Sequence, residues 1–269
     1  MKIIGEKING TRKLVAKAIA ERDATFIQNL AKKQVEGGAS WLDVNAGTLP
    51  DREADDLAWL IGLVQEVTDV PLCLDSANPA ALRVAMQHVK KTPLINSISG
   101  EQSRLRDILP IVAENGCEVI ALCMDDKGIP PTVQARVAVI DKVFEETRRA
   151  GVPDAKMYVD PLVMTIATDT EAAQITFGAM RAIRAQFPQA HISCGLSNVS
   201  FGLPVRALIN RTFLVLALEA GMDTAIIDPN DRELQAAMRA ADLLLGRDKH
   251  CLGYTRAYRA GLLENKASV

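Results

Sequence analysis

Short apolar runs alternate with longer amphipathic segments along the whole chain. The short runs are near-continuously apolar for four or five residues, which is typical of strands buried in a parallel sheet. They occupy residues 3–9, 41–47, 71–76, 93–99, 119–125, 157–163, 191–197 and 224–230. Strands that alternate in this way with amphipathic segments predict repeated strand–helix units.

The segments between the runs carry helix signals. Residues 54–67 have the 3.6-residue spacing of a helix with one buried face. Asn78 and Pro79 supply a capping residue followed by a proline at the first helical position. These signals support helices between the strands.

Glycines mark the point at which several helices end before a strand. Gly38, Gly116 and Gly221 each stand there, where glycine closes a helix in the left-handed conformation. Eight strand–helix units in strict alternation predict an α/β fold, a (β/α)8 TIM barrel, as a single domain over residues 1–269. A short terminal helix is expected at about 254–264.

Polar side chains follow the apolar part of every run. In a barrel of this kind the active site lies at the C-terminal ends of the strands. The polar residues at these ends are Glu6, Asn9, Asp43, Asn45, Asp75, Asn96, Asp125, Asp160, Ser197, Asn198 and Asp228. A single Asp or Asn there is as often a helix cap as a ligand contact, but a set from all the strand ends predicts one site at the mouth of the barrel.

Composition and charge exclude several classes of partner. The chain has 269 residues and a net charge of −2, so it has no basic field for nucleic acid. We expect no membrane span and no signal peptide, because no apolar stretch is long enough.

The five cysteines form no C-x-x-C pair, which predicts reduced thiols and a cytoplasmic protein. Cys73, Cys123 and Cys194 lie in apolar runs and are expected in the core.

The residue types at the strand ends exclude several chemistries. They include no histidine, which argues against a zinc or two-metal hydrolase, so no metal site is expected. Lys7 and Lys127 are expected to be solvated or paired rather than to form a Schiff base. Residues 227–231 are acidic, where phosphate-binding barrels have a glycine-rich loop.

A mouth lined by Asp and Asn suits a neutral, flat, nitrogen-rich ring such as a pterin or a purine. A carboxylate accepts two parallel N–H bonds from a guanidine-like ring edge, and an amide offers both a donor and an acceptor.

Gly195-Leu196-Ser197 at first suggests a serine nucleophile, but the elbow motif G-x-S-x-G has Val199 in its last position here. The pattern therefore favours ring binding over acyl transfer.

Several stretches together carry a family pattern. They are IIGEKING (3–10), EGGASWLDVNAG (36–47), LCLDS (72–76), INS (95–97), YVDPL (158–162), GLSNVSFGLP (195–204) and INRTFL (209–214). Over almost its whole length the sequence resembles the pterin-binding methyltransferases, in particular the methyltetrahydrofolate:corrinoid protein methyltransferases. A similar barrel with looser matches serves in the folate module of methionine synthase and in dihydropteroate synthase.

The resemblance implies methyl transfer between N5 of (methyl)tetrahydrofolate and the cobalt of a corrinoid (cobalamin). It implies that Asp75, Asn96 and Asp160 bind the polar edge of the pterin. It also implies that Asn198 reaches N5 and donates an N–H as charge develops there, with Asp75 tuning the supply of the N5 proton. Further implied lining residues are Glu6, Asp43, Asn45, Met124, Gly195, Ser197 and Asp228.

The resemblance also implies partners. The corrinoid is expected on a separate corrinoid protein, and a homodimer is expected by family analogy. Residues 248–253 match the cobalamin signature D-x-H-x-x-G, but too few residues follow for the domain that normally surrounds it. We therefore expect this match to be a coincidence.

Two other functions remain open from the sequence. One is a different pterin-site enzyme such as a dihydropteroate synthase, although residues 224–235 lack the Arg-x-His pattern of that activity. The other is a non-catalytic folate-binding module. The direction of methyl transfer also stays open, because both directions share one transition state.

Overall fold

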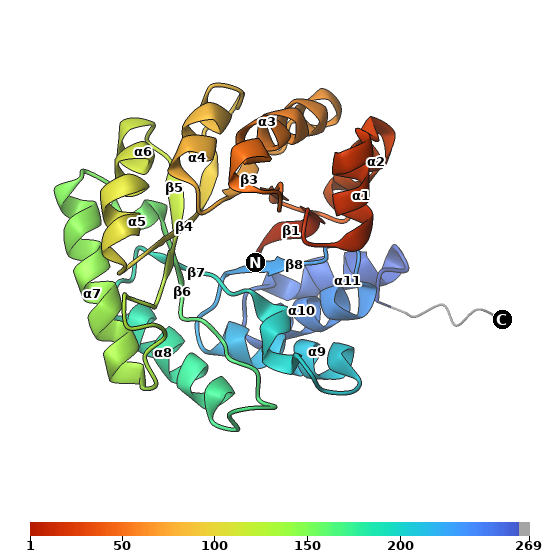
Figure 1. Cartoon of the computed structure of the whole chain (residues 1–269). Coiled ribbons are helices and arrows are strands. Elements are labelled where there is room, and N and C mark those ends of the chain that lie inside the picture. Colours follow the sequence, from red (N-terminus) through yellow and green to blue (C-terminus); the bar gives the residue numbers. More distant parts are fainter. Residues whose placement is uncertain (264–269) are drawn as a thin grey trace.

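Eight parallel strands form a barrel with helices around its outside in the computed structural model, which describes residues 1–263 (Figure 1). The strands are β1 (Lys2–Asn9), β2 (Trp41–Asn45), β3 (Leu72–Asp75), β4 (Leu94–Ser99), β5 (Glu118–Leu122), β6 (Met157–Asp160), β7 (His191–Ile192) and β8 (Thr224–Ile227). Their order is β7-β6-β5-β4-β3-β2-β1-β8, and all pairs are parallel. The predicted (β/α)8 barrel is confirmed, and each predicted run overlaps one strand.

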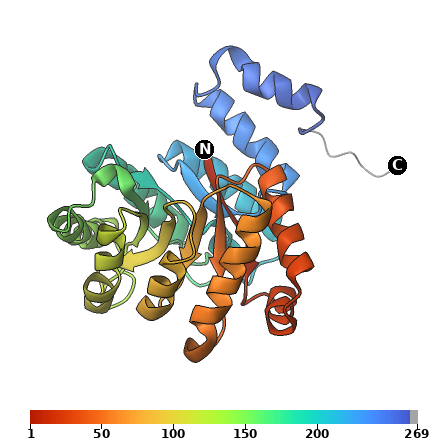
Figure 2. The same ribbon diagram turned by 90° about the horizontal axis from the view of Figure 1, so that it is seen from above.

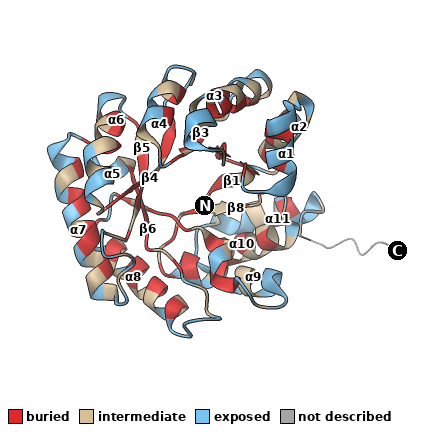
Figure 3. Ribbon diagram, in the orientation of Figure 1, coloured by how far each residue is buried: buried red, intermediate tan, exposed pale blue. Residues whose placement is uncertain are grey.

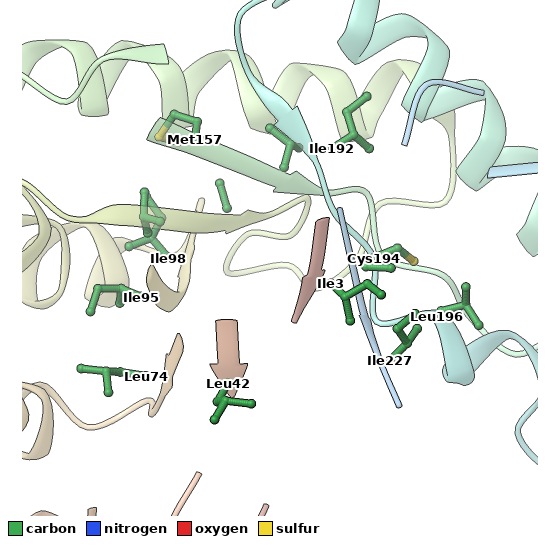
Figure 4. Packing of buried hydrophobic residues seen from close by; sticks show 14 of the residues in the cluster. Ile3, Leu42, Leu74, Ile95, Ile98, Met157, Ile192, Cys194, Leu196 and Ile227 are labelled. Carbon is green, nitrogen blue, oxygen red and sulfur yellow. The ribbon is translucent and has the colours of Figure 1, made fainter. Parts of the chain in front are cut away.

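The barrel closes between the segment that follows β7 and strand β8. The Ile226 N–H donates to the Cys194 carbonyl at 3.0 Å, and Gly195 forms an isolated parallel bridge with Ile226. Figure 4 shows the buried side chains of Ile3, Cys194 and Ile227 at this seam. The chain beyond β7 therefore belongs to the barrel wall, although it does not form a regular ladder.

Most of the helices cover the outside of the barrel. The helices of the described chain are α1 (Lys13–Glu21), α2 (Ala24–Glu36), α3 (Pro50–Val67), α4 (Pro79–Met86), α5 (Gln102–Asp107), α6 (Leu109–Glu114), α7 (Val133–Arg149), α8 (Ala172–Gln186), α9 (Arg206–Glu219), α10 (Arg232–Leu244) and α11 (Leu252–Arg259), with short 3-10 helices η1 (Asp154–Lys156), η2 (Leu196–Ser200) and η3 (Lys249–Cys251). Among residues 1–263, none of the helices is long and apolar enough to cross a membrane.

Apart from the C-terminal helix, the helices and helix ends predicted from the sequence are present in the structure. Helix α3 contains residues 54–67, and the Asn78 side chain caps α4 by accepting bonds from the first backbone N–H groups of that helix. Gly38, Gly116 and Gly221 have φ angles of 92°, 61° and 108°, so each takes the left-handed region before a strand as predicted.

Side chains fill the base of the barrel, at the N-terminal ends of the strands. They are Ile4, Trp41, Cys73, Leu94, Ile120 and Tyr158. The Trp41 and Tyr158 rings meet edge to face at 5.7 Å, and the Lys2 Nζ donates to the Tyr158 hydroxyl at 2.8 Å. His191 stacks on Tyr158, so it lies at this end, as its place at the start of β7 predicts. Figure 3 shows buried residues along the strands and the inner faces of the helices.

Four strands end earlier than predicted: β5, β6, β7 and β8 stop three or more residues before the ends of their apolar runs. At the ends of β6 and β8 an aspartate, Asp160 or Asp228, accepts a bond from the backbone N–H two residues later, which turns the chain out of the sheet. Asp125 makes the same turn three residues beyond the end of β5. Val163 and Leu196 beyond the turns stay buried, so hydropathy alone could not show where the strands end.

The C-terminal helix is shorter than the predicted 254–264. Helix α11 ends at Arg259, because Gly261 takes a φ of 67° and the Leu262 N–H turns back to the Ala257 carbonyl. Figure 2 shows α11 beside α10 and apart from the barrel wall. Position 264 of the predicted helix, and the end of the predicted 1–269 domain, lie outside the described residues.

Candidate active site

Side chains from three neighbouring strands meet at the C-terminal end of the barrel. The strand register places Asp43 beside Cys73, and Asp75 beside Asn96. The Asn45 Nδ2 donates to Asp75 Oδ2 at 2.8 Å, and the Asn96 Nδ2 donates to Asp43 Oδ1 at 3.5 Å. Four predicted site residues, Asp43, Asn45, Asp75 and Asn96, therefore form one group, which we call the carboxylate–amide cluster.

Burial lowers the charge of this cluster. Asp43 is 3% exposed, and burial together with the nearby Asp75 carboxylate raises the pKa of Asp43 to about 8. Burial also raises the pKa of Asp75, against the effect of its bond from Asn45. The Cys73 thiol, whose own pKa burial raises, shares a hydrogen bond with Asp43. At neutral pH Asp43 is therefore mostly protonated, which suits a neutral ligand.

A third carboxylate, Asp160, joins the end of β6 to the segment after β7. Its Oδ1 accepts the Leu162 N–H at 2.8 Å, and its Oδ2 accepts the Gly195 N–H at 3.1 Å. Asp160 is 5% exposed, and burial raises its pKa to about 6, while the two backbone bonds and Arg136 oppose that rise. At neutral pH the group is mostly ionised, and each oxygen keeps a lone pair for a ligand donor.

Arg136 of α7 holds the loop that follows Asp160, and sequence reasoning missed it. The side chain is buried; its Nη1 donates to the carbonyls of Pro161 at 2.8 Å and Leu162 at 2.5 Å, and its Nε donates to the Pro130 carbonyl at 3.0 Å. Burial lowers the pKa of Arg136. An arginine within an amphipathic helix looks like a solvated residue in the sequence, and its partners here are backbone carbonyls and, at 3.4 Å, the Thr176 hydroxyl, so no motif indicated it.

Asn198 and Ser197 lie on the 3-10 turn η2, not at the end of a strand as predicted. The turn begins directly after Gly195, which still pairs with Ile226 of β8 but whose N–H bonds to the Asp160 side chain rather than to a backbone carbonyl. Asn198 is exposed and Ser197 is half-buried. The Asn198 Nδ2 lies close to Gly195, since a Cβ added there would be in ordinary contact with it at 3.4 Å. The turn therefore starts against Asp160 and carries Asn198 at the mouth.

Charged pairs from β1 and the end of β8 form another part of the mouth. The Lys7 Nζ pairs with Asp228 Oδ2 at 2.6 Å, so Lys7 is paired as expected. Burial raises the pKa of Glu6, while positive charges on Lys7, Arg12 and Arg206 oppose the rise. Glu6 also acts electrostatically on Asp43, which places this part next to the carboxylate–amide cluster.

Two residues after β5 take part in loop structure. Met124 is half-buried, and its carbonyl accepts the Gly100 N–H at 2.8 Å, which ties the loops after β4 and β5 together. Asp125 closes the turn to Lys127 through its Oδ1. A contact between Met124 and a pterin therefore stays a prediction, and Asp125 has a structural role.

The segment that matches the cobalamin signature starts helix α11. Asp248 accepts the backbone N–H groups of Gly253 at 2.9 Å and Tyr254 at 2.7 Å, and His250 is exposed. These bonds give Asp248 a capping role. Within residues 1–263, no three His, Cys, Asp or Glu side chains gather so as to hold a metal ion.

Several known proteins are similar in sequence to this chain over most of its length. The profile of the family described as "Pterin binding enzyme" matches residues 5–228. The methylcorrinoid:tetrahydrofolate methyltransferase of Eubacterium limosum is 40% identical over 263 residues, which cover 97% of each chain. The methionine synthase of Mycobacterium leprae is 31% identical, in a match that covers 94% of this chain and 22% of that enzyme.

Solved structures share the barrel at much lower identity. DHPS of Yersinia pestis has a TM-score of 0.70 at 16% identity, and the match covers 91% of this chain and 93% of that chain. The 7,8-dihydropteroate synthase of Vibrio fischeri has a TM-score of 0.68 at 17% identity, with the same two coverages. These likenesses show the fold alone.

Proposed function

Since this chain belongs to the family of pterin-binding enzymes, we propose that it moves a methyl group between N5 of tetrahydrofolate and the cobalt of a corrinoid on a separate protein. The observation that carries this proposal is the identity of 40% to the Eubacterium enzyme over 97% of both chains. The polar mouth supports it, because a pterin presents a row of N–H donors that carboxylates and amides can satisfy.

In this proposal Asp75, Asn96 and Asp160 bind the polar edge of the pterin. Asp160 faces a ligand with a fixed carboxylate, because two backbone N–H groups hold it. Asp75 and Asn96 belong to the carboxylate–amide cluster, where Asn45 orients Asp75. Burial makes each ligand bond selective, since an unmatched donor or acceptor would lose its partner.

Asn198 is the proposed catalytic amide. Its Nδ2 can donate to N5 as negative charge develops there, which stabilises the transition state more than the bound substrate. Asp75 is the second proposed catalytic residue and tunes the supply of the N5 proton. Support comes from Asp43, whose raised pKa of about 8 keeps a proton on the carboxyl group next to Asp75.

The remaining lining residues are proposed to shape the site. They are Glu6, Asp43, Asn45, Met124, Gly195, Ser197 and Asp228. Gly195 has the best structural support among them, because its N–H donates to Asp160. Asp228 acts through its pair with Lys7.

The proposal includes partners and a location. The corrinoid supplies the cobalt that takes or gives the methyl group, and a separate corrinoid protein presents it at the barrel mouth. We also propose a homodimer, for which exposed Leu208 and Leu216 on α9 offer apolar surface. A cytoplasmic location is supported by Cys73, Cys123 and Cys194, which are buried and unpaired as predicted.

A methyl-transfer assay tests the function. The purified chain is mixed with methyltetrahydrofolate and cob(I)alamin, and the loss of cob(I)alamin absorbance is followed; the reverse reaction starts from methylcobalamin and tetrahydrofolate. We expect turnover in both directions. Folate binding without turnover, either with free cobalamin or with a corrinoid protein, would leave only a binding module.

The Asn198→Ala variant tests the catalytic amide. We expect the rate of methyl transfer to fall at least ~100-fold, as for loss of a donor at a developing charge, while folate affinity changes little. Equal losses of rate and affinity would contradict this role. The homodimer is tested separately by sedimentation of the wild-type chain.

A further inference from the structure

The turn that carries Asn198 is held from outside by the first residue of α9. The Arg206 Nη2 donates to the Ser197 carbonyl at 2.7 Å, and its Nε donates to the Ser200 hydroxyl at 3.0 Å. The same hydroxyl donates to Asn210 Oδ1 at 2.7 Å. Arg206 therefore ties the two ends of the Ser197–Ser200 turn to the helix that follows it.

The bond to the Ser197 carbonyl matters because that carbonyl belongs to the peptide group leading into Asn198. Fixing the peptide plane fixes the direction in which the Asn198 side chain leaves the backbone. The turn's own bond from the Asn198 N–H to the Gly195 carbonyl is long, at 3.4 Å, and Asn198 is exposed. The carbonyls of Asn198 and Val199 accept backbone bonds from Phe201 and Ile166, and a guanidinium that donates two bonds in one plane adds a restraint at the Ser197 carbonyl, on the other side of Asn198.

The charge of Arg206 also reaches the mouth. Its positive charge opposes the rise in the pKa of Glu6 on β1, so the guanidinium is close enough to that carboxylate to act on it electrostatically. Arg206 therefore holds the turn by hydrogen bonds and also contributes positive charge near Glu6.

We propose that Arg206 is a positioning residue for methyl transfer, which bridges Ser197 and Ser200 so that the Asn198 amide is held toward the pterin ring. This inference rests on the proposed function. Arg206 is not among the residues proposed to contact the pterin. Its effect on methyl transfer is assigned to its bond with the peptide group between Ser197 and Asn198.

The first test compares Arg206→Met with the wild-type chain. Methionine keeps most of the side-chain length but donates no hydrogen bond. We expect kcat to fall about 10- to 100-fold, as for the loss of a charged hydrogen bond, and the folate Kd to stay within about threefold. The matched control is Arg211→Met on the same helix, whose side chain pairs with Glu233 instead of the turn, and it should retain the wild-type kcat.

The second test is a double-mutant cycle with Asn198→Ala. If Arg206 acts through Asn198, adding Arg206→Met to Asn198→Ala should cause no further loss of kcat. Independent losses that multiply would overturn the inference, because they would mean that Arg206 acts on the ligand directly. A folate Kd that weakens as much as kcat falls would overturn it in the same way.

Further variants keep the inference testable if Arg206→Met does not fold. Ser200→Ala removes one of the two acceptors and should lower kcat less than Arg206→Met, and Arg206→Lys should restore only part of kcat, because one ammonium cannot reproduce the planar fork. Full activity in both would overturn the inference. Failure of the proposed function is distinguishable, since the wild-type chain itself would then show no methyl transfer.

Discussion

Replacing Asp160 by asparagine tests whether this carboxylate is kept for the ligand at a cost to the fold. Burial raises the pKa of Asp160 from 3.8 to about 6. Above pH 6 the group is ionised in both the folded and the unfolded chain. Keeping it ionised in the folded chain then costs about 3 kcal/mol relative to the protonated form, from the difference between the two pKa values.

The sign of the pH dependence follows from the raised pKa. The stability that Asp160 contributes is fully present below pH 3.8 and is lost as the pH rises through 6. Between pH 5 and pH 7.5 the wild-type chain should lose about 1 kcal/mol through this group. The asparagine side chain does not titrate, so the Asp160→Asn variant should not show this loss.

At pH 7.5 two effects of Asp160→Asn oppose each other. The variant avoids the ionisation cost of about 3 kcal/mol. Its amide NH2 then faces either the Leu162 or the Gly195 N–H, so two donors lose an acceptor, at about 1–3 kcal/mol each. We therefore expect the variant at pH 7.5 to lie between about 1 kcal/mol more stable and about 3 kcal/mol less stable than the wild type, and to bind folate about 10- to 100-fold more weakly.

Urea unfolding of both chains at pH 5, 6, 7 and 7.5 measures the cost of ionising Asp160 in the folded chain. The free energy of unfolding of the variant minus that of the wild type should rise by about 1 kcal/mol from pH 5 to pH 7.5, since all other titrating groups are shared. Titration with methyltetrahydrofolate at pH 7.5 measures the folate affinity of both chains. A difference that stays constant with pH refutes the buried ionisation, and an unchanged folate affinity refutes the proposed orientation of the pterin.

Three other substitutions give separate tests. Arg136→Met should lower the free energy of unfolding in urea by about 3 kcal/mol, because it leaves the carbonyls of Pro161 and Leu162 without that donor; wild-type stability would contradict the role of this arginine. Asn78→Ala should cost about 1 kcal/mol in the same measurement, since it removes the cap of α4, and no change would show that the cap bonds add nothing. Ser197→Ala should keep most of the methyl-transfer rate, and complete loss would return the serine to consideration as a nucleophile.

The barrel, and the grouping of polar side chains at its C-terminal end, could be predicted because both follow from patterns along the chain. Buried strands leave apolar runs, and parallel strands bring the residues at their C-terminal ends to one mouth. The grouping of Asp43, Asp75 and Asn96 was predicted in this way. Their mutual contacts could not be predicted, since the bond from Asn45 to Asp75 depends on the register between β2 and β3.

The supporting residues were missed for a different reason. Arg136 and Arg206 donate mainly to loop carbonyls, and a carbonyl is present at every residue, so no side-chain motif marks the target. The strand ends were misplaced because Val163 and Leu196 remain buried after the chain has left the sheet. Hydropathy reports burial, and loops that pack against a barrel mouth are buried as well.

The packed base of the barrel has a consequence for the order of events in the proposed reaction. Trp41 and Tyr158 are buried among the side chains that fill that end of the barrel. In the proposed reaction folate can then enter and leave only through the mouth. If the corrinoid protein docks over the mouth, it closes the same passage, so folate has to bind before that carrier and leave after it. An excess of carrier should then slow turnover by trapping folate, and the filled base would impose an order of binding without any moving part.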